Sequence, residues 1–129
     1  MKHEGMRSPL GHAIGLGSAK EGVEHWWQQR LTAIALVPLG LWFVVALLAH
    51  VGGGYEQTVA WLGRPIPAIV MIVLIAVTFY HTALGVQVVV EDYVHREWVK
   101  LGALIALRFA CVLLAVAGIF AVLRVSVGG

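Results

Sequence analysis

Two ionisable side chains, His81 and Arg108, interrupt the long apolar blocks of this 129-residue chain. His81 stands about nine residues from the nearer end of its block, or ~14 Å at helical rise, which puts it near the middle of a bilayer. A polar side chain at that depth has either a hydrogen-bond partner or a metal. His81 is therefore either bonded to a carbonyl or hydroxyl of a neighbouring helix or, since neutral imidazole is the commonest protein donor to haem, an axial haem ligand.

Gly85 follows His81 by one helical turn and lies on nearly the same face. Its missing Cβ would leave room for a flat macrocycle, although glycine also serves ordinary helix packing. His50 lies at the opposite end of its own block, so His81 is the only histidine of the chain at this depth. A six-coordinate haem would have to take its second ligand from another subunit.

The pair Asp92 and Tyr93 is the second candidate for chemistry. Asp92 follows His81 by 11 residues, so a continuous helix returns it to within roughly 20° of the same face, ~16 Å farther along the axis. A tyrosine hydroxyl can donate to a ligand carbonyl, and a neighbouring carboxylate can relay protons. The alternative is an interfacial tyrosine beside a solvated acid.

Three further side chains have ordinary explanations beside functional ones. Arg30, at the mouth of the first block, could bind a haem propionate or a lipid phosphate, or simply follow the positive-inside rule. Arg108 lies one to two turns inside its block and either snorkels to the surface or pairs with a polar group. Cys111, the single cysteine, sits in an apolar block and is interpreted as a packing residue.

Other chemistries are absent from the pattern. The chain shows no phosphate-binding glycine motif, no nucleophile and base constellation, no cysteine pair and no zinc-ligand spacing. On these grounds the chain alone is a poor candidate for an enzyme.

The elements that must position these residues are membrane-spanning helices. The chain is 60% hydrophobic and 12% charged, whereas a soluble domain carries about 25% charged residues. Apolar blocks of about 20 residues match a hydrocarbon core of about 30 Å. The sequence therefore predicts an all-α membrane protein with spans at 31–50, 65–90 and 101–123, in a membrane domain of residues 30–129.

Local signals refine this prediction. Pro38 should bend the first span, the glycines at 52–54 should end it, and residues 55–64 should form a short outer connection before Pro65. Residues 1–29 are not apolar enough to span, and Gly15, Gly17 and Gly22 disfavour an independent helix there. This segment is predicted to lie on the membrane surface or under a partner. The first apolar block starts too late for a cleaved signal peptide, so we expect it to be retained.

Loop charges set the expected orientation. The basic residues on the N-terminal side of the membrane outnumber those on the other: Lys2, Arg7, Lys20, Arg30, Arg96 and Lys100 against Arg64 and Arg124. The positive-inside rule then places the N-terminus in the cytoplasm and, after three spans, the C-terminus outside it. A formal charge of +2 and a pI near 9.0 are accounted for by these flanking residues, and no nucleic-acid partner is expected.

Two stretches resemble the hydrophobic membrane-anchor subunit of succinate dehydrogenase in its alphaproteobacterial form. The first comprises residues 15–22 (GLGSAKEG), 25–27 (HWW) and 29–36 (QRLTAIAL). The second comprises residues 80–81 (YH), 85–89 (GVQVV) and 91–95 (EDYVH), with the 11-residue step from histidine to the Asp-Tyr pair. The third span and the outer loop match this family in hydropathy only.

The resemblance implies roles for five residues. His81 would be an axial ligand of haem b, with the other ligand from a companion cytochrome b556 subunit that completes the helix bundle. Tyr93 would hydrogen-bond a ubiquinone carbonyl, with Asp92 in the proton-supplying region. Arg30, joined by His25, would lie near the haem propionates. Arg108 has no family role that the resemblance supplies.

The expected function is that of the membrane-anchor subunit of succinate:ubiquinone oxidoreductase, in the bacterial inner membrane. Its partners would be the cytochrome b556, iron–sulfur and flavoprotein subunits, together with membrane lipid. The chain would take part in quinone reduction without oxidising succinate. One alternative is a cofactor-free structural subunit of a respiratory complex, which haem content would distinguish. Another is a small transporter subunit with His81 in a proton relay, disfavoured because all acidic residues lie outside the spans.

Overall fold

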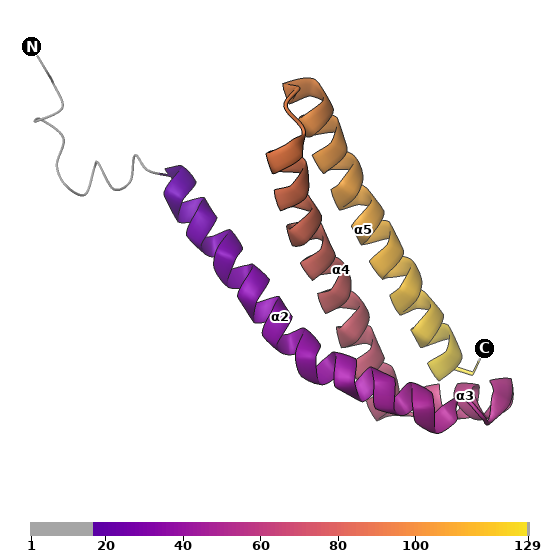
Figure 1. The fold of residues 1–129 in the computed structure, drawn as a ribbon. Helices are drawn as coiled ribbons and strands as arrows, with labels where there is room; N and C mark the ends of the chain where they lie inside the picture. The colour runs from indigo at the N-terminus through magenta and orange to yellow at the C-terminus, as the bar shows by residue number, and fades with distance from the viewer. Residues whose placement is uncertain (1–16, 129) are drawn as a thin grey trace, which may run out of the picture.

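The structure, a computed structural model, describes residues 17–128, and over this range every regular element is an α-helix. The helices are α2 (Gly17–His50), α3 (Gly54–Leu62), α4 (Pro65–Tyr93) and α5 (Glu97–Ser126) (Figure 1). Three segments are long and apolar enough to cross a bilayer: Gly22–His50, Pro65–Tyr93 and Glu97–Ser126. The predicted all-α membrane fold with three transmembrane helices is confirmed.

Glycine and proline set the turns at the end of the bundle where α2 stops and α4 starts. α2 stops before the glycine run, and Gly54 has a φ of 75°, a left-handed conformation that residues with a Cβ adopt only at a cost. α4 starts with Pro65 in its first turn, where the missing backbone N–H costs no helical hydrogen bond. Between these points lies α3, so the expected short connection at 55–64 is mostly helical.

At the opposite end, where α2 starts and α4 stops, the helices extend beyond the predicted spans. α2 starts at Gly17 despite Gly17 and Gly22, because here the segment prolongs an existing helix and needs no nucleus of its own. The earlier part of the predicted 1–29 surface segment, with Lys2, Arg7 and Gly15, lies outside the described residues. α4 continues through Tyr93, and only residues 94–96 separate it from α5.

α4 is the central helix of the described bundle. It packs against α5 along most of its length and against α2, and Figure 1 shows α2 diverging from the other two toward its N-terminal end. α2 is curved, in line with the bend expected from Pro38. Near the C-terminal end of α2, the stacked rings of Trp42 and Trp61 connect α2 with α3, and the His50 ring lies 4.5 Å from the Trp61 ring.

Small side chains allow α4 and α5 to approach closely. A Cβ on Gly118 of α5 would lie 3.3 Å from Cγ2 of Ile75 on α4. Few residues in the described part of the chain are buried, and they are small or medium-sized: Ala46, Ala68, Leu84, Cys111 and Val122. The packing role expected for Cys111 agrees with its burial as a free thiol.

Most large apolar side chains point outward. Leu48, Val112 and Phe120 are among many that remain exposed on the described helices. In water such a surface would be unstable, whereas lipid tails or the helices of another subunit cover it without cost. The three spans therefore leave most of their large apolar side chains to lipid or to another protein and do not enclose an extensive core of their own.

The contact at Gly118 generates a stability prediction. Gly118→Val should destabilise the protein by about 1–3 kcal/mol, because the added methyl groups would overlap Ile75 and separate α4 from α5. Gly102→Val is the matched control on the same helix, since a Cβ there meets nothing within 4 Å. Thermal unfolding in detergent micelles tests this, and equal losses from both variants would contradict the assigned packing.

Candidate functional site

His81 lies where α4 faces α2. Its ring is half-buried, and its Nδ1 atom lies 2.8 Å from Oγ1 of Thr32 on α2. No hydrogen bond to its Nε2 atom occurs within residues 17–128. The structure thus supplies the hydroxyl partner on a neighbouring helix that the sequence left open, and leaves the second ring nitrogen available to a metal.

Gly85, one turn beyond His81, faces the same helix. A Cβ at Gly85 would lie 3.5 Å from Nε2 of Gln29, an ordinary van der Waals distance. Gly85 therefore lies at the contact between α2 and α4, where a side chain as small as that of alanine would also fit.

Two buried polar atoms near this contact have no hydrogen-bond partner. They are His25 Nε2 and Gln29 Oε1, both on α2. His25 precedes Thr32 by seven residues, so the two share one face of α2 about two turns apart. Buried polar atoms are normally paired, so each unpaired one calls for a group not contained in the described chain. The two atoms could pair with a polar group of a ligand or of a partner side chain.

Arg30 takes a different direction from the residues that face α4. It stands two positions before Thr32, about 200° around the helix, and its guanidinium carbon lies 4.9 Å from the centre of the Trp26 ring. Trp26 in turn makes an edge contact with the Trp27 ring at 5.2 Å. The structure brings His25 toward α4, but it does not bring Arg30 there.

Asp92 and Tyr93 lie in the last turn of α4. The helix is unbroken from His81 to this turn, as the sequence analysis assumed. Asp92 therefore lies on nearly the same face of α4 as His81, ~16 Å farther along the axis. Tyr93 is 78% exposed, and neither side chain makes a hydrogen bond or ion pair with another described residue. Both are free to contact a ligand or another subunit at the membrane surface.

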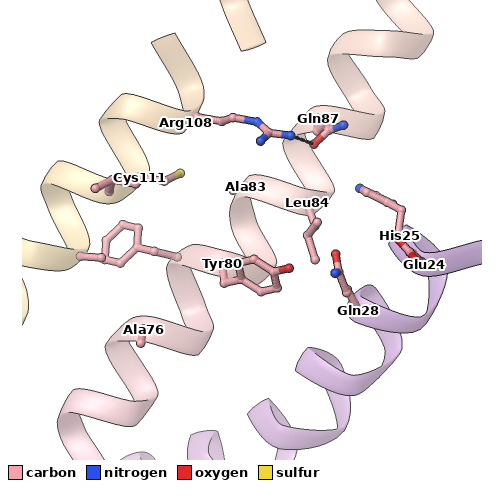
Figure 2. A pocket seen from close by; sticks show the side chains of 13 residues that line it. Glu24, His25, Gln28, Ala76, Tyr80, Ala83, Leu84, Gln87, Arg108 and Cys111 are labelled. Carbon is pink, nitrogen blue, oxygen red and sulfur yellow. Dashed lines mark hydrogen bonds between the residues drawn. The ribbon is translucent and has the colours of Figure 1, made fainter. Parts of the chain in front are cut away.

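A cavity of about 590 Å³ lies between α2, α4 and α5 (Figure 2). Its polar side chains include His25 and Gln28 from α2, Tyr80 and Gln87 from α4, and Arg108 from α5. His81, Asp92 and Tyr93 do not line it. Of the predicted site residues, the cavity contains only His25.

Arg108 is partnered within the chain. Its Nη2 atom donates a hydrogen bond of 3.3 Å to Oε1 of Gln87, whose Nε2 donates at 3.1 Å to Oε1 of Glu91 (Figure 2 draws the first bond). Of the two alternatives that the sequence left for Arg108, snorkelling to the surface or pairing with a polar group, the structure shows the pairing. Gln87 and Thr32 are the polar partners that sequence reasoning missed, because only helix packing shows which side chains meet.

The described residues contain no group of three or more His, Cys, Asp or Glu side chains placed to hold a metal ion. A metal bound at His81 would therefore need ligands beyond residues 17–128. Three spans that hold a histidine within the bilayer define a multi-pass membrane protein with an incomplete polar site.

Comparisons with known proteins identify the family. The profile of the succinate dehydrogenase/fumarate reductase transmembrane subunit matches residues 4–115. The chain belongs to this family, which confirms the resemblance seen in the sequence.

Curated relatives carry the same description over nearly full length. The succinate dehydrogenase hydrophobic membrane anchor subunit of Rickettsia bellii is 37% identical over 116 residues, 90% of this chain and 93% of the relative. That of Paracoccus denitrificans is 31% identical over 121 residues, 94% of this chain and 93% of the relative. The membrane anchor subunit of Reclinomonas americana is 29% identical over 92 residues, 69% and 77% of the two chains. No solved structure matches the chain significantly.

The Arg108 bridge generates a second prediction. In a double-mutant cycle, Arg108→Leu and Gln87→Leu should be coupled by about 0.6 kcal/mol, a typical value for a hydrogen bond between membrane helices. Unfolding in lipid micelles provides the measurement. Gln28→Leu is the control, because Gln28 lines the same cavity without bonding Arg108. Equal coupling in both cycles would contradict the specific bridge.

Proposed function

We propose that this chain is the membrane-anchor subunit of a succinate:ubiquinone oxidoreductase that shares one haem b with a cytochrome b556 subunit and forms part of the ubiquinone-reduction site. The observation that carries the proposal is the His81 imidazole, held through Nδ1 and with Nε2 unpartnered within residues 17–128. Membership of the anchor family supports the same role.

The residues present fit a haem beside His81. Nε2 of a neutral imidazole is a normal iron donor, and the buried unpaired atoms of His25 and Gln29 lie on the side of α2 that faces α4. When bound, haem would supply one-electron transfer. We place His25 near the haem propionate groups. Arg30 would also lie near the propionates, on a face of α2 that a partner subunit would cover.

Tyr93 and Asp92 would act at the cytoplasmic surface. The exposed Tyr93 hydroxyl would donate a hydrogen bond to a carbonyl of ubiquinone and orient it, while the Asp92 carboxylate would accept protons from water and deliver them toward the quinone. Their exposure supports this role, because a quinone site there would be completed by a facing subunit. The iron–sulfur and flavoprotein subunits would supply the electrons taken from succinate.

Loop charge supports the proposed location. By the positive-inside rule, the excess of basic residues beside the N-terminus and the loop at 94–96 supports a cytoplasmic position for these parts and a periplasmic C-terminus in a bacterial inner membrane. Tyr93 and Asp92 would then lie on the side where the soluble dehydrogenase docks and where protons enter.

Replacement of His81 tests the haem assignment. In the purified complex, His81→Ala should abolish or markedly disturb the b-type haem signal, because the only proposed iron donor of this chain is lost. The measurement is the haem-to-protein ratio and the reduced-minus-oxidised optical spectrum. His50→Ala, at the outer end of α2, should leave both unchanged. An unchanged spectrum in His81→Ala would favour a cofactor-free structural anchor.

Replacement of Tyr93 tests the quinone assignment separately. Tyr93→Phe removes one hydrogen bond worth about 0.5–1.5 kcal/mol, so kcat/KM for ubiquinone should fall by roughly two-fold to ten-fold. Succinate oxidation with a soluble electron acceptor should be preserved. Tyr55→Phe, an exposed tyrosine at the outer end, is the matched control. Equal quinone reduction in all three complexes would remove Tyr93 from the site.

A further inference from the structure

Thr32 is the residue through which α2 contacts His81. Its Oγ1 atom lies 2.8 Å from His81 Nδ1, 2.8 Å from the carbonyl oxygen of Gln28 and 3.0 Å from that of Gln29. The hydroxyl has one proton to donate and two lone pairs that accept. Where that proton points decides which nitrogen of His81 carries hydrogen.

The hydrogen-bond donors of Thr32 and His81 favour one tautomer of the imidazole. If the Thr32 hydroxyl donated to Nδ1, a neutral His81 would carry its hydrogen on Nε2, and no described residue accepts a bond from that atom. In an apolar environment an unpaired donor is costly. If the hydroxyl instead donates to the Gln28 carbonyl, Oγ1 accepts the Nδ1–H bond and every donor is satisfied.

The local structure holds Thr32 in this arrangement. A threonine within a helix commonly donates to the carbonyl four residues earlier, and its β-branched side chain has few rotamers. The acceptor for His81 is therefore in place before any ligand binds. The bond joins residues 49 positions apart, so it also fixes the ring orientation on α4 relative to α2.

We infer that Thr32 is a positioning residue for the haem ligand: it accepts the Nδ1–H bond of His81, selects the tautomer with a free Nε2 lone pair, and aims that atom at the iron. The inference rests on the proposed haem role of His81. An acceptor at the far nitrogen also raises the basicity of a histidine ligand, which favours the more highly charged oxidation state of the metal.

Substitution of Thr32 tests the inference in the intact complex. Thr32→Val preserves shape but removes the acceptor, so haem affinity should fall about 10- to 100-fold and the haem midpoint potential should rise. Thr32→Ser keeps the hydroxyl and should behave like the parent. Thr82→Val is the matched control. The Thr82 hydroxyl makes the same type of bond, at 2.8 Å to the Thr78 carbonyl, but no hydrogen bond to His81.

The readouts are haem retention on dilution and a redox titration of the haem absorbance, neither of which depends on turnover. If valine prevents assembly, Thr32→Cys replaces it, since a thiol is a weak acceptor, and its potential should also rise. Parent-like potential and haem retention in the assembled valine or cysteine variant would overturn the inference. Haem retained unchanged in His81→Ala would instead overturn the proposed function, so the two failures are distinguishable.

Discussion

The hydrocarbon interior of a bilayer offers no hydrogen-bond partners, so every polar group that this chain places there must be satisfied by protein or ligand. The backbone meets this constraint by forming three long helices. The side chains of Thr32 and Thr82 meet it by bonding carbonyls of their own helices. His81 and Arg108 meet it across helices, and these two contacts place the polar residues of the chain relative to one another.

α4 carries both cross-helix contacts and therefore organises the site. His81 and Gly85 of α4 face α2. On the side of α5, Gln87 of α4 bonds Arg108, and Ile75 of α4 packs against Gly118. The cavity lies between all three helices and is lined by His25 and Gln28 of α2 as well as by Arg108 of α5, but not by His81. The described chain therefore holds a second polar region, which contains Arg108 and which His81 does not line.

The described helices leave both apolar surface and polar atoms without partners. Many large apolar side chains face outward, and His25 and Gln29 each bury an unpaired polar atom. A single-chain fold with these features would be unstable in water, but a subunit of a membrane complex gains missing partners from lipid and neighbouring chains. Family membership and the physical incompleteness of the chain therefore point in the same direction.

The sequence by itself determined the three spans, the all-α fold and the residues worth attention, because hydropathy and an isolated membrane histidine are properties of the linear chain. It also placed Asp92 on the stripe of His81, since both belong to one continuous helix. It did not determine that residues 17–29 extend α2, that α3 fills the outer connection, or that Thr32 and Gln87 are the partners of His81 and Arg108. Those features depend on how the helices pack, because a hydrogen bond between residues 49 positions apart is decided by the crossing of two helices.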